Sequence, residues 1–473
     1  MRDTAVRGCS LLCEMKICYL GSERTQPRPD NDPNMYQKRL LLFAGLLWHS
    51  VTFAQSNLPS IEEVADKFYN TYETGSSTAE YRFEKRPGRW TVTVRQWDGL
   101  RLVPTGKYLF FDVDSGGYQR LLLPPKADTA RVDFRKDIDD FQLANYRIHG
   151  YYGYDGWYKD VIATLSVKGP LFDSALNSLA RAYSTYANCM VTNQGDDGLK
   201  SDLLDLPLAS NCMTPAQRER YHQIESKAIE TFSRLVRQNP NFETIVGKVP
   251  IKYANEVMVE FHTYLTYADS FAVNFSLPDH LYPDDVVAKA RQVLEKCPAD
   301  AILLSLGDND FYPILYLQQH LHVRSDVRLI NRNLIGLDRF IYMAGQPQFQ
   351  SQPVRLSVTP RAYKGPTNDY LFLKDRSTAM PFSEVVDTLQ NGHGDENGAL
   401  TLPAKEFILR RGMGNDTVHF RETTRYILKT DWILLDLLNN LHGRRLACET
   451  LLEDSLVPLN TYFVQVDDNL FVY

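Results

Sequence analysis

The chain has 473 residues, of which 44% are hydrophobic and 23% are charged, and its formal net charge is −6. This composition is that of a globular protein long enough for two or three domains. No block of lysine and arginine rises above the background, so the basic surface that nucleic-acid binding requires is excluded.

A signal peptide is predicted at residues 35–55, where Lys38 and Arg39 precede an apolar core and Ala54 offers a small residue for cleavage. The alternative is a buried N-terminal helix. Residues 1–34 hold three cysteines and three prolines without periodicity, so we expect an unstructured upstream extension there. No later apolar run has the 18 or so residues of a spanning helix. The mature chain is therefore expected to be exported, in the periplasm or at the envelope, with no transmembrane span.

The mature sequence retains four cysteines, Cys189, Cys212, Cys297 and Cys448. Cys189 and Cys212 bracket a polar insertion, and an oxidising compartment would permit a disulfide between them. Free buried thiols are the other interpretation. No cysteine or histidine spacing is typical of a zinc site.

Residues 56–145 are predicted to form a helix followed by a small antiparallel β subdomain. Ser60 and Glu63 have the spacing of a capping box at the start of a helix over 60–74. Between residues 81 and 125, apolar residues alternate with period two, and glycine-containing turns separate the runs, which is typical of a meander.

An aromatic stretch, residues 146–158, follows this subdomain. Tyr152, Tyr154 and Trp157 could stack on the apolar face of a sugar ring, which would make carbohydrate a ligand. The other interpretation, which we prefer, is a satellite core that seats the sheet on the helices behind it.

Residues 146–298 are predicted to be a helical domain with one tetratricopeptide-like hairpin. Two sets of residues have the spacing of that repeat, Leu176, Leu179, Ala180 and Tyr183 for the first helix and Ala228, Phe232, Leu235 and Pro240 for the second. Such helices stack to bury their faces and expose a concave surface. We therefore expect one or more protein partners to bind the helical repeats.

Residues 299–473 are predicted to be an α/β domain with a mixed or parallel sheet. The apolar run 301–306 breaks at the sequence GDND, residues 307–310, and a helical pattern continues over 311–322. A second short strand, 327–330, follows at the distance of a βαβ crossover, so the two strands should be parallel and buried. The fold class is thus α/β plus α-helical repeat.

The GDND turn is the candidate site because open α/β sheets bind ligands at the carboxyl ends of their strands. Asp308 and Asp310 form a D-x-D pair that could chelate a divalent cation, with Asn309 beside them. Helpers are expected at the end of the second strand, Asn331 and Asn333, and near Asp338 or Arg339. The alternative is structural, with Gly307 permitting the turn and Asp310 capping the following helix.

Short elements complete the chain. Strands are predicted over 354–358, 370–373, 444–448, 462–466 and 470–473, with a helix over 430–441. The polar loop 393–398 lacks the spacing of a calcium loop. His320 and His322 are two residues apart on a helix, so they would not share a metal. No serine-hydrolase, zinc-protease or phosphate-loop motif is present.

Three stretches carry a resemblance to a known family: GDNDFYPILYLQQHLHVRSDVRLINRNLIGLDRFI, then residues 363–387, then LKTDWILLDLLNNLHGRRLACET followed by PLNTYFVQVDDNLFVY. Residues 284–473 resemble the exported C-terminal part of the protein O-mannosyltransferase-like multi-pass membrane proteins, glycosyltransferase family 117. In that family the membrane helices are expected to perform glycosyl transfer, and this sequence contains no such helices. Transferase activity is therefore not carried over to this chain by the resemblance. The N-terminal half, with RFEKRPGRW and YYGYDGWYKDVI, is similar to exported tetratricopeptide proteins of Gram-negative bacteria.

Two functions are consistent with these observations. The first, which we favour, is an exported, non-enzymatic binding or assembly protein that joins a helical-repeat scaffold to a glycosyltransferase-accessory-like domain. The second is a cation-dependent carbohydrate-active enzyme, for glycosyl transfer or hydrolysis, that uses Asp308 and Asp310. No cofactor other than that divalent cation is expected.

Overall fold

The computed structural model describes residues 58–74, 79–97, 102–127, 154–191, 212–268, 275–358, 370–374, 379–391, 401–402, 404–410, 417–421, 426–449, 463–467 and 470–473. The expected upstream extension, the signal peptide, Tyr152 and the polar loop 393–398 lie outside these residues. Contacts divide the described residues into an N-terminal unit, residues 58–190, and a C-terminal unit, which is residue 191 with residues 212–473.

A helix and an antiparallel sheet begin the N-terminal unit, as the sequence predicts. Helix α3 (Ile61–Tyr69) opens on the expected capping box, in which Ser60 and Glu63 each accept a hydrogen bond from the other's backbone N–H. The sheet has the order β4-β3-β2-β1-β5. Its strands are β1 (Ala79–Arg86), β2 (Arg89–Trp97), β3 (Leu102–Asp112), β4 (Gly117–Tyr118) and β5 (Tyr154–Asp155). Only the pairing of β5 with β1 is parallel.

Aromatic side chains fill the space between α3 and this sheet. Phe68 is 0% exposed, and its ring centre lies 5.2 to 5.4 Å from the rings of Tyr69, Tyr72, Tyr81, Phe83 and Phe110. Tyr154 and Trp157 belong to the same core and are 6% and 4% exposed. Their rings pack inside the unit, so they do not form an exposed stacking surface for a sugar.

Two helices complete the N-terminal unit, α6 (Trp157–Leu165) and α7 (Asp173–Val191). The last residue of α7, Val191, groups with the C-terminal unit. Tyr158 of α6 stacks on Tyr186 of α7 with ring centres 5.4 Å apart. Ala182 of α7 reaches the aromatic core. Helix α7 carries the first half of the predicted tetratricopeptide pattern.

The C-terminal unit begins with helices that carry the second half of that pattern. They are α8 (Pro215–Gln238), α9 (Val249–Tyr267) and α10 (Asp284–Lys296), with a short hairpin of β6 (Glu243–Thr244) and β7 (Gly247–Lys248) before α9. Helix α8 packs against α9, and α9 and α10 pack against α11 (Asp308–His320). Since α7 and α8 fall in different units, the tetratricopeptide-like hairpin stays a prediction.

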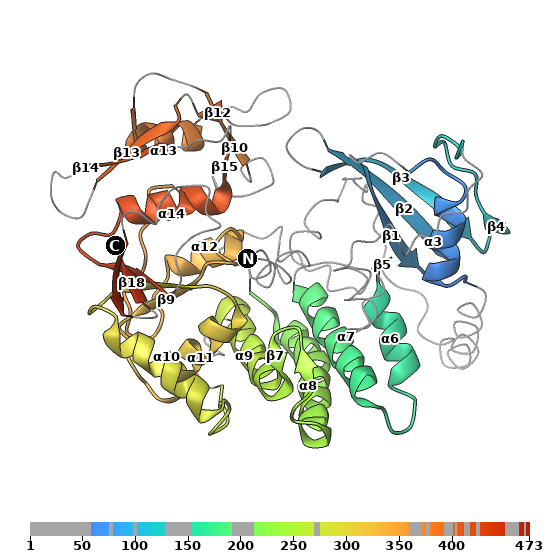
Figure 1. Ribbon diagram of the computed structural model, residues 1–473, viewed down its shortest axis with the longest axis horizontal. Coiled ribbons are helices and arrows are strands. Elements are labelled where there is room, and N and C mark those ends of the chain that lie inside the picture. The colour runs from blue at the N-terminus through green and yellow to red at the C-terminus, as the bar shows by residue number, and fades with distance from the viewer. Residues whose placement is uncertain are drawn as a thin grey trace, which may run out of the picture. The chain divides into compact units, whose positions relative to one another are not determined.

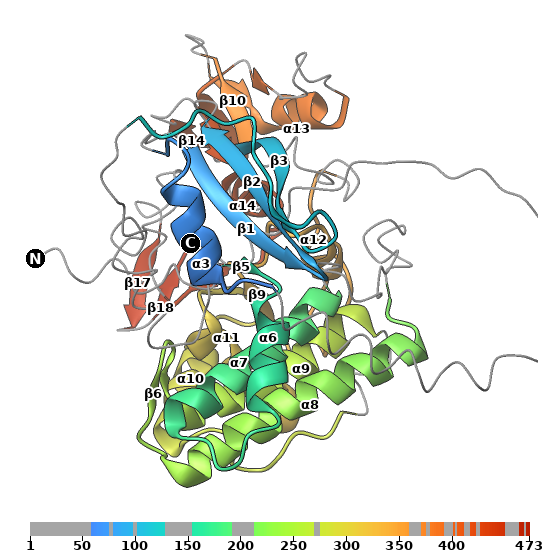
Figure 2. The same ribbon diagram turned by 90° about the vertical axis from the view of Figure 1, so that its right-hand side faces the viewer.

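A five-stranded sheet forms the centre of the C-terminal unit, with the order β17-β18-β16-β8-β9. The predicted βαβ crossover is confirmed: β8 (Ile302–Ser305), α11 and β9 (Arg328–Asn331) follow one another, and β8 pairs parallel with β9. Strand β16 (Leu446–Cys448) pairs parallel with the other side of β8, followed by β18 (Leu470–Val472) and β17 (Val464–Asp467). Figures 1 and 2 show this sheet between α10 and α11 on one side and α12 (Asp338–Ala344) and α14 (Lys429–Asn439) on the other.

Two three-stranded sheets pack with helix α13 (Phe382–Asn391) beyond α14 (Figure 1). One sheet is β12-β10-β15, with β12 (Thr401–Leu402), β10 (Tyr370–Leu373) and β15 (Tyr426–Leu428). The other is β11-β13-β14, with β11 (Met380–Pro381), β13 (Glu406–Arg410) and β14 (Thr417–Arg421). Their apolar side chains share one core with β8, β9, α12 and α14.

The strand predicted over 354–358 is wrong. The backbone N–H groups of Ser357 and Val358 donate to the carboxylate of Asp436, at 2.9 and 3.2 Å, instead of to a neighbouring strand. Asp436 lies in α14 and is 0% exposed, so these two bonds satisfy a buried carboxylate. Within the described ranges, none of the helices combines the length with the apolar character that a membrane crossing needs.

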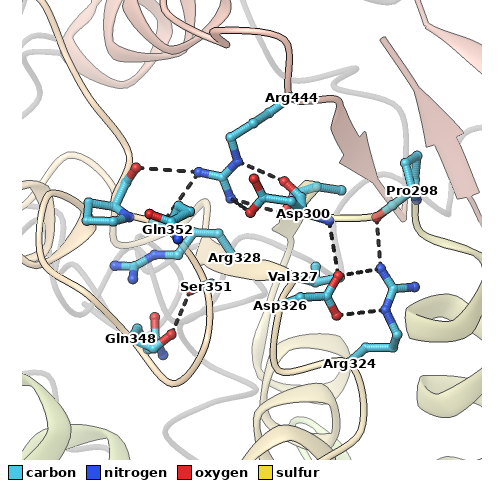
Figure 3. A network of polar contacts seen from close by, with 12 residues as sticks. Pro298, Asp300, Arg324, Asp326, Val327, Arg328, Gln348, Ser351, Gln352 and Arg444 are labelled. Atoms are coloured by element: carbon cyan, nitrogen blue, oxygen red, sulfur yellow. Dashed lines mark hydrogen bonds and ion pairs between the residues drawn. The ribbon is translucent and has the colours of Figure 1, made fainter.

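An arginine network ties the amino ends of the parallel strands together (Figure 3). Arg324 forms a two-pronged ion pair with Asp326 at 2.8 Å and donates to the carbonyl oxygens at the end of α10. Arg444 lies just before β16 and pairs with Asp300, just before β8, at 3.3 Å. Arg324 and Arg444 each neutralise one aspartate here, whereas the GDND turn lies at the opposite, carboxyl edge of the sheet.

Candidate functional site

The carboxyl edge of the central sheet contains a point where the strand order reverses. From β8 the chain crosses through α11 to β9 on one side, whereas β16 lies on the other side of β8. Ligands of open α/β sheets bind at such a point, outside the carboxyl ends of the two diverging strands. The GDND turn leaves β8 at this place.

Gly307 makes the turn possible, as predicted, because its φ of 83° lies in a region that favours glycine. Helix α11 then begins at Asp308, so Gly307 is the N-cap and no side chain caps the helix. The predicted capping role of Asp310 is therefore wrong. Asp310 lies in the first helical turn, where its negative charge is favourable to the helix dipole.

Asp308 and Asp310 have different partners, because residues two apart on a helix point to different faces. Asp308 is half-buried near Lys252 and Glu256 of α9, and burial raises its pKa although Lys252 opposes that rise. Asp310 pairs with Lys289 of α10, Oδ1 to Nζ, at 3.0 Å. Asp310 is thus paired with a lysine, whereas Asp308 only lies near Lys252, which pairs with Glu256.

Asn309 links the turn to helix α9 and to the hairpin before it. Its Nδ2 donates to the Val246 carbonyl at 2.7 Å, and its Oδ1 accepts from Asn255 Nδ2 at 2.8 Å. Asn255 is 0% exposed, and its own Oδ1 accepts from the Tyr282 hydroxyl at 2.9 Å. The side chains of Asn309 and Asp310 therefore bond α9 and α10, the helices that cover the sheet.

Glu449 is a site residue that sequence reasoning missed. It directly follows β16, is 8% exposed, and accepts a hydrogen bond from Ser305 Oγ at the end of β8 at 2.5 Å. Burial raises the pKa of Glu449 to about 8, and the negative charge of Asp310 adds to that rise. The signal was present in the sequence, since Glu449 is the first polar residue after a predicted strand, but nothing there indicated that this strand neighbours β8.

The other predicted helpers serve the local structure. Asn331 ends β9, and its Oδ1 accepts from the backbone N–H of Asn333 at 3.0 Å. Arg339 is 5% exposed and donates from Nε to the Thr266 carbonyl of α9 at 2.8 Å. Asp338 begins α12. The structure therefore brings Ser305, Asp310 and Glu449 together and leaves Asn331, Asn333 and Arg339 in separate contacts.

A group of buried carboxylates lies between α8 and α9. Glu225 and Glu256 are 1% and 0% exposed, and Lys252 pairs with Glu256 at 2.5 Å. Burial and the charge of Glu256 raise the pKa of Glu225 well above its usual range.

No three histidine, cysteine, aspartate or glutamate side chains in the described part of the chain are grouped so that they could hold a metal ion. His320 pairs instead with Asp279, Nε2 to Oδ1, at 2.7 Å. The divalent-cation site at Asp308 and Asp310 stays a prediction, and Asp310 would have to exchange its ion pair with Lys289 for the cation.

Residues 286–410 match the protein family described as TMEM260-associated domain 2. The match covers most of α10, then β8, the GDND turn, α11, β9 and α12, and in the small sheets β10 to β13 with α13. No curated protein and no solved structure matches the chain significantly. The match agrees in part with the resemblance to O-mannosyltransferase-like membrane proteins, at the level of a glycosyltransferase-related accessory domain.

Proposed function

We propose that this chain is a binding or assembly protein of a Gram-negative envelope, in which the C-terminal unit is a glycosyltransferase-accessory-like domain. The observation that carries this proposal is the engagement of the GDND side chains. Asp308 lies near Lys252, Asn309 bonds Val246 and Asn255, and Asp310 pairs with Lys289. These contacts fix α9 and α10 to the sheet, which is what a domain that presents a rigid surface requires.

The partner surface of this proposal is the exposed face of α8. After its first turn, its exposed positions are charged or polar and carry both signs, including Glu219, Arg220, Lys227, Glu230 and Arg234. Mixed charge of this kind favours a specific protein partner over a nucleic acid or an anionic membrane, because complementary charges set orientation and suppress wrong partners. We expect that partner to be a membrane protein of the glycosyltransferase type.

A second candidate function rests on Glu449 and Asp310. A carboxyl group that keeps its proton to about pH 8 lies near a carboxylate paired with Lys289. A carboxyl group with a raised pKa can act as general acid while a second carboxylate acts as general base, as glycosidic bond cleavage requires. This candidate is a carbohydrate-active enzyme, with carbohydrate as its substrate class.

Photo-crosslinking tests the first candidate. A photoreactive phenylalanine replaces Lys227 or Arg234 on α8, and Leu122, which is 94% exposed in the N-terminal unit, receives the same group as the control. We expect both α8 positions, and not position 122, to crosslink one membrane protein of the glycosyltransferase type in envelope preparations. Crosslinking of no such protein from α8 contradicts the proposal.

Turnover measurements on the purified chain test the second candidate. Envelope glycans are incubated with the wild type, with Glu449→Gln and with Asp308→Ala, and released sugar is measured with and without calcium, magnesium or manganese. An enzyme would lose about 10²-fold or more of its rate in Glu449→Gln. A loss of activity in Asp308→Ala, together with a requirement for a metal ion, would support a cation-dependent enzyme. Absence of turnover in the wild type rejects the enzyme candidate. The crosslinking result then decides the binding-protein candidate independently.

A further inference from the structure

A small cavity lies beside β9, apart from the crevice between β8 and β16. Its volume is about 60 Å³, and it lies between α9, the start of α11, β9 and α12. Apolar side chains form most of its wall, including Leu265, Phe311, Ile335, Phe340 and Met343. The polar groups at its wall come from His262, Thr266, Arg328, Asn331 and Gln348.

The cavity lies along the open edge of the central sheet, because β9 is the last strand of that sheet. The backbone N–H groups of Arg328 and Arg332 donate to Ala301 and Ser305 of the β8 segment, at 2.8 and 3.0 Å. Strand residues alternate in direction, so the backbone N–H and C=O of Leu329, between them, face away from β8. Leu329 is one of the residues at the cavity wall.

His262 presents an unused polar edge to this cavity. It is 9% exposed, and its ring packs against those of Phe311, Tyr312 and Phe340 at 5.0, 5.9 and 5.3 Å. Burial lowers its pKa to about 4, so the ring is neutral and offers one donor and one acceptor. No hydrogen bond joins this ring to another residue that the structure describes.

Arg328 brings a positive charge that no described carboxylate neutralises. It is 3% exposed, and its two Nη atoms donate to the Gln346 and Met343 carbonyls at 2.9 and 2.6 Å, which leaves Nε without a partner. The acids nearest to it in the amino-edge network already pair with other arginines, Asp326 with Arg324 and Asp300 with Arg444. Figure 3 shows the Arg328 side chain pointing away from both acids. A buried donor and a buried positive charge are costly unless an acceptor meets them.

We propose that this cavity binds a small carboxylate with a short, branched apolar tail. The carboxylate accepts from the His262 ring and neutralises the charge of Arg328, and the tail packs against Phe311, Ile335 and Met343. A cavity of this kind holds about one water for each 10–15 Å³, so its volume of about 60 Å³ admits about four to six non-hydrogen atoms. Isobutyrate has that size and shape.

Calorimetric titration of the full chain with isobutyrate tests this site. Isobutyramide, which has the same shape without the charge, is the ligand control. We expect saturable binding of isobutyrate and at least tenfold weaker binding of isobutyramide, because only the carboxylate neutralises Arg328. Equal affinities, or no saturable binding of isobutyrate, would overturn the proposal.

Two variants test whether the ligand binds in this cavity. Both keep Arg328, because its loss would also remove the hydrogen bonds that it donates to carbonyls at the end of α12. Ala344→Leu fills the cavity from α12, and His262→Phe keeps the aromatic packing but removes the ring nitrogens. We expect Ala344→Leu to abolish binding and His262→Phe to weaken it about tenfold, while Leu122→Ala in the N-terminal unit leaves it unchanged. Circular dichroism confirms that each variant is folded, and undiminished binding by folded Ala344→Leu rejects this location.

Discussion

Glu449 couples the stability of the C-terminal unit to pH. The folded protein keeps its carboxyl proton to about pH 8, whereas the unfolded chain releases it above the ordinary pKa of 4.5. Folding therefore takes up a proton between these values, and the free energy of unfolding falls as pH rises from about 4.5 to 8. Glutamine keeps an oxygen to accept from Ser305 but carries no ionisable proton.

We predict that Glu449→Gln becomes more stable than the wild type as pH rises. The difference in free energy of unfolding should be small near pH 4.5 and reach about 3–5 kcal/mol near pH 8, by the energy of a shifted pKa. Urea denaturation at pH 5, 6.5 and 8 measures it. Glu295→Gln is the control, because Glu295 lies on the exposed side of α10, its side chain 57% exposed. A difference that does not grow with pH would show that Glu449 is ionised in the folded protein.

The GDND turn joins elements through Asn309 more than through its aspartates. Loss of the Asn309 side chain leaves the fully buried Asn255 without an acceptor for Nδ2 and the Val246 carbonyl without its donor. Unmet buried groups of this kind cost about 1–3 kcal/mol. The ion pair of Asp310 with Lys289 is partly exposed, with side chains 27% and 56% exposed, and such pairs contribute about 0–1 kcal/mol.

We therefore predict that Asn309→Ala destabilises the chain by about 1–3 kcal/mol and that Asp310→Ala costs less than about 1 kcal/mol. Equilibrium denaturation of the two variants under identical conditions gives both values. A larger loss of stability in Asp310→Ala than in Asn309→Ala would mean that Asp310 stabilises the helix as a cap would. In that case the first turn of α11 would depend on its carboxylate.

Elements were predictable where a local rule determines them. The Ser60 and Glu63 capping box located the start of α3, and the apolar run before GDND located β8. Features that depend on distant residues were not predictable. Strand 354–358 failed because Asp436 takes its N–H groups, and Glu449 was missed because its partner Ser305 lies 144 residues earlier in the chain. The capping role predicted for Asp310 was wrong because the helix begins three residues earlier than predicted, at Asp308.

The molecule consists of two units with separate cores. Phe68 lies at the centre of the aromatic core of the N-terminal unit, and Trp432 of α14 is 0% exposed in the core of the C-terminal unit. The helices α8 to α10 group with the sheet and not with α7, although the sequence places all four in one helical domain. The Asn309 and Asp310 contacts explain this grouping, because they bind α9 and α10 to the start of α11.

Separate cores should give separate unfolding transitions. We predict two transitions in calorimetry, and that Phe68→Leu lowers the midpoint of only one of them. Phe68 loses ring contacts with five aromatic neighbours, so the loss should be about 1–3 kcal/mol, or roughly 5–15 °C for a domain of this size. Trp432→Phe should lower the other midpoint instead. If either variant moved both transitions together, the two units would unfold as one cooperative structure, and a partner bound at α8 could then stabilise the aromatic core of the N-terminal unit as well.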